Sequence, residues 1–141
     1  MSDSIMHNGR KIRVGDFAQI EKHITESDLT GYADVSGDYN PIHIDETYAK
    51  KSIFGRRIAH GLLCTGMISA LLGNSLPGRG TLILREDLRF LKPVFENDTI
   101  VAMVTVLEIV QEKGRITMGV SCKNQDGTEV LQGKIFTKVM E

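Results

Sequence analysis

Residues 60–72 read HGLLCTGMISALL, and a helix formed by this run would be apolar on nearly every side. Such a helix is normally buried at the centre of a fold, because no face of it suits water. Its small residues Gly61, Gly66 and Ser69 would let another backbone or a ligand come close. The sequence therefore predicts a buried helix from about residue 60 to residue 73.

Beyond this segment the apolar residues recur with a period of two, which is typical of β-strands. The clearest strand alternates apolar residues with small or polar ones, and its apolar members are Ile116, Met118, Val120 and Cys122. Residues 124–127, NQDG, form a hairpin turn signal after it. An earlier strand is expected at Leu82 and Leu84, continued by Leu88 and Phe90. Strands joined by short turns are antiparallel, so we expect an α+β fold in which an antiparallel sheet wraps around a central buried helix.

The first half of the chain predicts short helices and loops. Thr25 with Asp28 forms a capping box, which predicts a helix over residues 26–35, and the residues SGDYNP at 36–41 would end it. Asp45 can cap a second short helix. A short strand is expected between residues 12 and 24.

Composition limits the class of protein. A length of 141 residues fits one domain, residues 1–141, and a net charge of -1 argues against a nucleic-acid partner. Neither a signal peptide nor a membrane-spanning run is apparent, so we expect a cytoplasmic protein without membrane association. Cys64 and Cys122 lack metal-site spacing and suit buried thiols in a reducing compartment.

Titratable side chains are densest at residues 36–45, SGDYNPIHID. Asp38 and His43 can both accept a proton near neutral pH, and an imidazole can also return one. Taken singly, Asp38 and Asn40 suit an ordinary turn and His43 a surface histidine. Together on a loop stiffened by glycine and proline, they favour a catalytic site.

Residues 37–43, GDYNPIH, strongly resemble the hydratase motif of the MaoC-like (R)-specific enoyl-CoA hydratases and dehydratases. Residues 60–63, HGLL, and 88–94, LRFLKPV, resemble later blocks of the same family, in the same order. The resemblance covers roughly residues 14–139 and implies a hot-dog fold. It also implies a hydro-lyase of fatty acid metabolism, which adds water to a trans-2-enoyl thioester or removes it from an (R)-3-hydroxyacyl thioester.

The resemblance assigns roles by position. Asp38 and His43 correspond to the catalytic pair, and Asn40 would help to position the water or that pair. Gly61 would bring the thioester oxygen to the helix start, although tight helix packing is an alternative reason for a glycine. Ser69 would lie near the acyl group, with a bond to its own helix as the alternative. Leu72 is expected to line the acyl pocket.

The resemblance also implies partners for the chain, and two alternative functions compete with the one it implies. We expect no cofactor, with coenzyme A or acyl carrier protein as the thioester carrier, and a homodimer or higher homo-oligomer. His60 could join Asp38, His43 and Asp45 around a metal, but a cap or hydrogen-bonding role is the commoner one, and we expect no metal. A hot-dog acyl-CoA thioesterase and a non-catalytic acyl-CoA-binding domain are the alternative functions.

Overall fold

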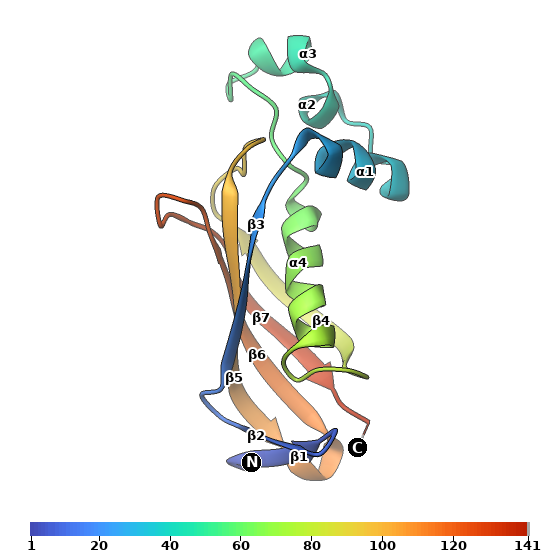
Figure 1. Cartoon of the computed structure of the whole chain (residues 1–141), viewed down its shortest axis with the longest axis vertical. Helices are drawn as coiled ribbons and strands as arrows, with labels where there is room; N and C mark the ends of the chain where they lie inside the picture. Colours follow the sequence, from blue (N-terminus) through green and yellow to red (C-terminus); the bar gives the residue numbers. More distant parts are fainter. Residues whose placement is uncertain (141) are drawn as a thin grey trace.

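The computed structural model describes residues 1–140 and contains one large antiparallel sheet with helices on one side (Figure 1). The sheet has five strands in the order β3-β5-β6-β7-β4. Their bounds are β3 (Phe17–His23), β4 (Leu82–Phe90), β5 (Thr99–Val110), β6 (Arg115–Lys123) and β7 (Glu129–Lys138). A separate hairpin, β1 (Ser4–His7) and β2 (Arg10–Arg13), lies near both chain ends. The one-turn 3₁₀ helix η1 (Gln111–Lys113) joins β5 to β6.

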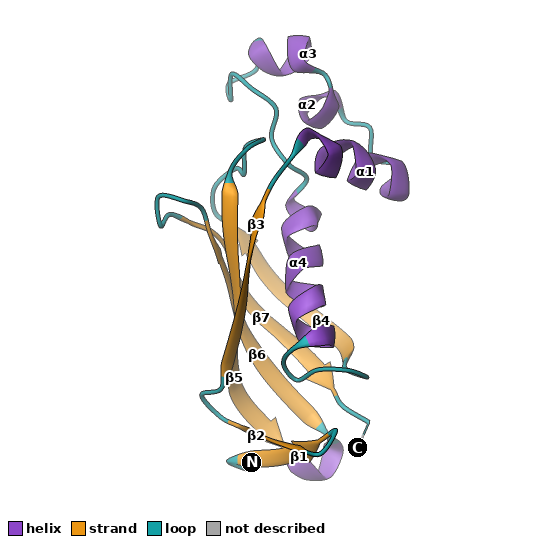
Figure 2. Ribbon diagram, viewed as in Figure 1, coloured by secondary structure: helices purple, strands orange, loops and turns teal. Residues whose placement is uncertain are grey.

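Helix α4 (Gly61–Asn74) runs along the sheet, while three shorter helices gather beyond its amino end (Figure 2). These are α1 (Glu26–Ser36), α2 (Pro41–Ile44) and α3 (Glu46–Lys50). The hot-dog architecture expected from the sequence is therefore confirmed. None of the helices within residues 1–140 is long and apolar enough to cross a bilayer.

The prediction of an apolar helix against the sheet is confirmed, but one face of α4 is open. Ile68, Leu71 and Leu72 are at most 1% exposed and belong to the main core. Leu62 is 55% exposed, and Ser69 is exposed as well. A sheet from one chain covers only one side of the helix, so the apolar residues on the other side remain accessible.

Strand β6 matches its period-two prediction. Its apolar residues Ile116, Met118, Val120 and Cys122 are all at most 5% exposed. The turn after it is also confirmed, since Asn124 Oδ1 accepts the backbone N–H groups of Asp126 and Thr128. The sheet's central strands therefore obey the simple rule that alternate residues face the core.

In the first half of the chain, several predicted elements are confirmed, but the β1–β2 hairpin and α2 were not predicted as such. The predicted opening strand corresponds to β3, but the β1–β2 hairpin was not expected. The capping box of α1 is present, with Asp28 N–H bonded to Thr25 Oγ1 at 3.2 Å and Thr25 N–H to Asp28 Oδ2 at 2.9 Å. The expected helix after Asp45 is α3, since Asp45 Oδ1 accepts the Tyr48 N–H at 3.0 Å. Helix α2 was predicted as loop, because a single turn is too short to show a helical period.

Candidate active site

The loop between α1 and α2 carries the first candidate residue. Gly37 ends α1 in a left-handed conformation, with φ 78°, and its N–H bonds to the Ala33 carbonyl at 2.8 Å. Asp38 follows, and its Oδ1 accepts the Asn40 N–H at 3.1 Å. Asn40 Oδ1 in turn accepts the Ile42 N–H at 3.4 Å and so caps α2. This chain of short-range bonds fixes the backbone of Asp38 and leaves its side chain 51% exposed.

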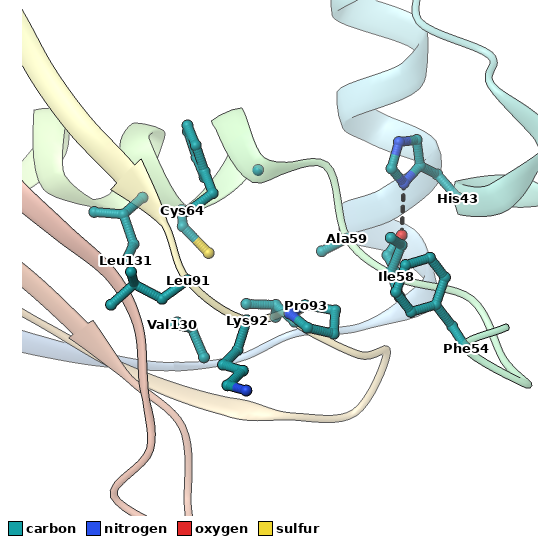
Figure 3. A pocket seen from close by; sticks show the side chains of 13 residues that line it. His43, Phe54, Ile58, Ala59, Cys64, Leu91, Lys92, Pro93, Val130 and Leu131 are labelled. Carbon is teal, nitrogen blue, oxygen red and sulfur yellow. Dashed lines mark hydrogen bonds between the residues drawn. The ribbon is translucent and has the colours of Figure 1, made fainter.

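His43 lies on α2 and is 8% exposed. Its Nδ1–H donates to the Ile58 carbonyl at 2.7 Å (Figure 3), which leaves Nε2 as the acceptor nitrogen. The pKa of His43 is lowered mainly by burial; the bond to Ile58 and the nearby Asp38 charge oppose this, while His60 adds to it. A neutral ring with a free Nε2 is the form that can accept a proton or a hydrogen bond from water.

His60 stands between these two residues and the start of α4. Its Nε2 donates to the Asp38 carbonyl at 3.0 Å and lies 4.0 Å from Asp38 Oδ2. Its ring stacks on His43 with centroids 3.9 Å apart. One carboxylate oxygen of Asp38 and one nitrogen of each histidine all lie within 4.8 Å of one another. The structure therefore brings the two predicted catalytic groups together, with His60 beside both.

A cavity of about 370 Å³ opens next to His43 and Gly61. Its walls come from the start of α4, the end of β4 with the loop after it, and the start of β7 (Figure 3). Phe90, Leu91 and Leu131 make much of this lining apolar, and Lys92 adds one cation. The site thus combines proton-accepting groups, the amino end of a helix and an apolar space beside them.

The thiol of Cys64 faces this cavity but is not suited to nucleophilic chemistry. Burial raises the pKa of Cys64 to about 11, so the thiolate is scarce near neutral pH. Cys64 therefore contributes to the lining of the cavity and not to the set of reactive groups.

The geometry of the cluster fits a metal ion poorly. In a tetrahedral zinc site with bonds of about 2.0–2.1 Å, the ligand atoms lie about 3.3 Å apart and converge on one point. The three candidate ligand atoms here lie within 4.8 Å of one another, which is a looser group, and the rings of His43 and His60 stack with an interplanar angle of 26°. The expectation that no metal binds here stays a prediction.

Three predicted substrate-binding residues lie apart from this cavity. Ser69 is on the exposed side of α4, and Leu72 is in the core at 1% exposure. Of the residues that the structure describes, neither Ser69 nor Leu72 nor Asn40 lines the cavity, whereas Gly61 does. Their predicted roles toward an acyl chain or a water molecule are untested.

Sequence reasoning missed two groups that shape the site. The Ile58 carbonyl orients His43, and Arg57 braces the same segment through bonds to Glu96 Oε1 at 2.9 Å from Nε and 2.7 Å from Nη2. Arg57 Nη1 also reaches the Ile44 carbonyl at 3.4 Å, next to His43. A backbone carbonyl leaves no signal in a sequence, and the pairing of Arg57 with Glu96 joins segments far apart in the chain.

Comparison with known proteins agrees with this geometry. Residues 15–127 match the family model described as a MaoC like domain. An (R)-specific enoyl-CoA hydratase of Rhodospirillum rubrum is 42% identical over 97% of this chain and 94% of its own length. A 3-hydroxybutyryl-CoA dehydratase of Methylorubrum extorquens is 40% identical over 91% of this chain and 81% of its own.

A solved structure gives the same result for the fold. An (R)-hydratase of A. caviae superposes with a TM-score of 0.88 at 32% identity, covering 92% of this chain and 98% of the other. The family match includes the α1–α2 loop, α4 and β4, which all contribute to the site. The chain therefore belongs to the MaoC-like domain family.

Proposed function

We propose that this chain is an (R)-specific enoyl-CoA hydratase, a hydro-lyase that reversibly adds water to a trans-2-enoyl thioester. The observation that carries the proposal is the convergence of Asp38 and His43, with a carboxylate oxygen and a ring nitrogen within 4.8 Å of each other, beside a cavity at the start of α4. The named functions of the relatives from Rhodospirillum rubrum and Methylorubrum extorquens support it.

The catalytic pair would act on one water molecule. Asp38 accepts a proton from this water as its oxygen attacks the β-carbon, while His43 Nε2 orients it. The electron pair of the double bond shifts toward the thioester carbonyl, and the α-carbon then takes up a proton from the pair on the same face. One water is consumed and both of its hydrogens are retained. Because the oxygen and the proton are delivered on the same face, the addition is syn, and its reversal is dehydration.

The start of α4 would stabilise the charge that builds up on the thioester oxygen. The first N–H groups of a helix lack partners within the helix, and the helix dipole favours a negative group there. Gly61 stands at this point and lines the cavity. A Cβ placed on Gly61 would lie 2.8 Å from the Phe90 ring, so the absence of a side chain keeps the approach open.

We expect Gly61→Ala to raise KM and to lower kcat/KM by about tenfold, since the added methyl group intrudes where the carbonyl approaches. Stability should change little, because alanine favours helix and the Phe90 ring, 54% exposed, can turn aside. Steady-state kinetics and thermal unfolding measure both effects. Gly31→Ala on α1 is the matched control, since this helical glycine is exposed and a Cβ there meets nothing within 4 Å. Equal kinetics for the two variants would contradict the assigned role of Gly61.

We also propose a homodimer formed through the open edge of β4 and the exposed side of α4. The apolar residues of β4 are unusually accessible, with Leu82 at 45%, Leu84 at 48% and Phe90 at 54%. An accessible apolar edge strand invites pairing with a second strand. Light scattering should give twice the 15.6 kDa mass of one chain; a stable, active monomer would argue against this assembly.

The direct test is an assay with a short trans-2-enoyl-CoA. Addition of the protein should remove the ultraviolet absorbance of the conjugated thioester, and chiral analysis of the product should give the (R)-3-hydroxyacyl thioester. Substrates of increasing length, on coenzyme A and on acyl carrier protein, then identify the preferred chain and carrier.

The same assay separates the alternative functions. A thioesterase would release free thiol, which a thiol reagent detects, without forming the 3-hydroxyacyl thioester. A binding domain would retain acyl-CoA without turnover. Either result would replace the hydratase proposal. The cytoplasmic location expected from the sequence stays a prediction.

A further inference from the structure

We propose that His60 is a positioning residue for hydration, which holds Asp38 and His43 side by side and ties both to the start of α4. This inference rests on the proposed function. In this role His60 transfers no proton and does not contact the substrate. It fixes the distance and orientation of Asp38 and His43, which do.

The bond to Asp38 is the first support. Asp38 lies in a loop and its side chain is 51% exposed, so little packing surrounds it. His60 Nε2–H reaches across from α4 to the Asp38 carbonyl at 3.0 Å, although the two residues are far apart in the chain. This bond fixes the carboxylate-bearing residue relative to α4, which the short-range bonds of the loop alone cannot do.

A contact among three rings is the second support. His60 lies against His43 with centroids 3.9 Å apart, and against Tyr32 with centroids 4.6 Å apart. Tyr32 belongs to α1, His43 to α2, and His60 is the residue just before Gly61 at the start of α4. The His60 ring therefore brings contacts from α1 and α2 to the start of α4.

The third support is that an imidazole is energetically unfavourable at this position unless it forms a specific bond. His60 is 3% exposed, and its Nδ1 is buried without a partner among residues 1–140. A buried polar atom without a hydrogen bond is unfavourable. A phenyl ring would fill the same space and stack equally well without that cost, so packing alone does not account for histidine. The Nε2–H bond to Asp38 does.

Two variants separate the bond from the ring. His60→Phe keeps a stacked ring and loses the donor, whereas His60→Gln keeps an N–H near the same place and loses the ring. We expect each to lower kcat about 10- to 100-fold with KM changed less than threefold, since misplacement by about 1 Å can cost that much. Leu29→Ala is the control, because this fully buried residue of α1 lies in the same helical layer. It should lower the melting temperature and leave kcat unchanged.

The pH profile of His60→Phe is a second measurement, because loosened packing alone would not shift it in the expected direction. Burial lowers the pKa of His43 most, the Ile58 carbonyl raises it, His60 lowers it and Asp38 raises it. With phenylalanine the burial remains and the electrostatic effect of residue 60 on His43 is lost, so the pKa of His43 should rise. The acid limb of kcat/KM should then move to higher pH, and the ring signals of His43 in NMR titrations should shift likewise.

The outcomes distinguish this inference from the proposed function. If the wild-type protein hydrates enoyl thioesters while both His60 variants keep wild-type kcat and pH profile, His60 is structural and the inference is wrong. If the wild-type protein hydrates none, the proposed function fails. The NMR titration of His43 still decides in that case whether His60 acts on it, and an unchanged titration in His60→Phe overturns the inference.

Discussion

Asp38→Asn should lower kcat for hydration of a short enoyl-CoA by about 10²–10⁴-fold, the usual contribution of a general acid–base group. The amide cannot accept the proton of the attacking water. Asparagine keeps an Oδ1 to accept the Asn40 N–H, which Asp38 bonds at 3.1 Å, so the loop should keep its shape. Steady-state kinetics measure the loss, and thermal unfolding should show a melting temperature within a few degrees of wild type.

The matched control is Asp34→Asn. Asp34 lies on the preceding helix, is exposed and accepts the Tyr39 hydroxyl at 2.8 Å, so the change in charge and size is the same. It should retain wild-type kcat. Full activity in Asp38→Asn would leave the proposed mechanism without its base, and equal losses in the two variants would point to a general effect of surface charge.

The strands show which part of the fold a sequence can predict. In β6 each alternate residue faces the core, so the apolar period can be read directly as burial. In β4 the same period misleads, since Leu82 and Leu84 are 45% and 48% exposed. A register shift between Ile83 and Arg85 interrupts the pairing, and β4 is an edge strand. The exposure of its apolar residues fits the proposed homodimer, in which a second chain would cover this edge.

The candidate site likewise has a part that the sequence predicts and a part that it does not. Asp38 and His43 could be predicted because they lie close together in the chain, within a stretch dense in polar and titratable residues. The groups that orient them could not, since they depend on tertiary contacts: the Ile58 carbonyl on His43 and the His60 ring between α1, α2 and α4. His60 could be identified as a titratable residue at a helix start, but its partners depend on how α4 meets the α1–α2 loop.

The second large effect is expected for His43→Asn, with a loss in kcat of about 10²–10⁴-fold. The amide nitrogen of asparagine can take the place of Nδ1 and donate to the Ile58 carbonyl, which His43 bonds at 2.7 Å. The substitution removes Nε2, the atom that we propose orients the water molecule. His23→Asn is the control, because His23 is exposed on β3 away from the cavity and should leave kcat unchanged. The double variant with Asp38→Asn should be about as impaired as either single one, since groups that act on one water are not additive.

His43→Asn should also change the pH dependence of stability, and the sign follows from burial. In the folded chain the pKa of His43 lies below its ordinary value of 6.5, mainly because burial disfavours the charged ring. As the pH falls through 6.5, the unfolded chain therefore binds a proton that the folded chain does not, and the free energy of unfolding decreases. Asparagine binds no proton in this pH range, so the substitution removes this difference between the unfolded and the folded chain. Denaturant unfolding at pH 7.5 and at pH 5.5 should show a smaller loss of stability on acidification in His43→Asn than in wild type, whereas an equal loss would mean that the His43 ring is accessible and free to ionise in the folded protein.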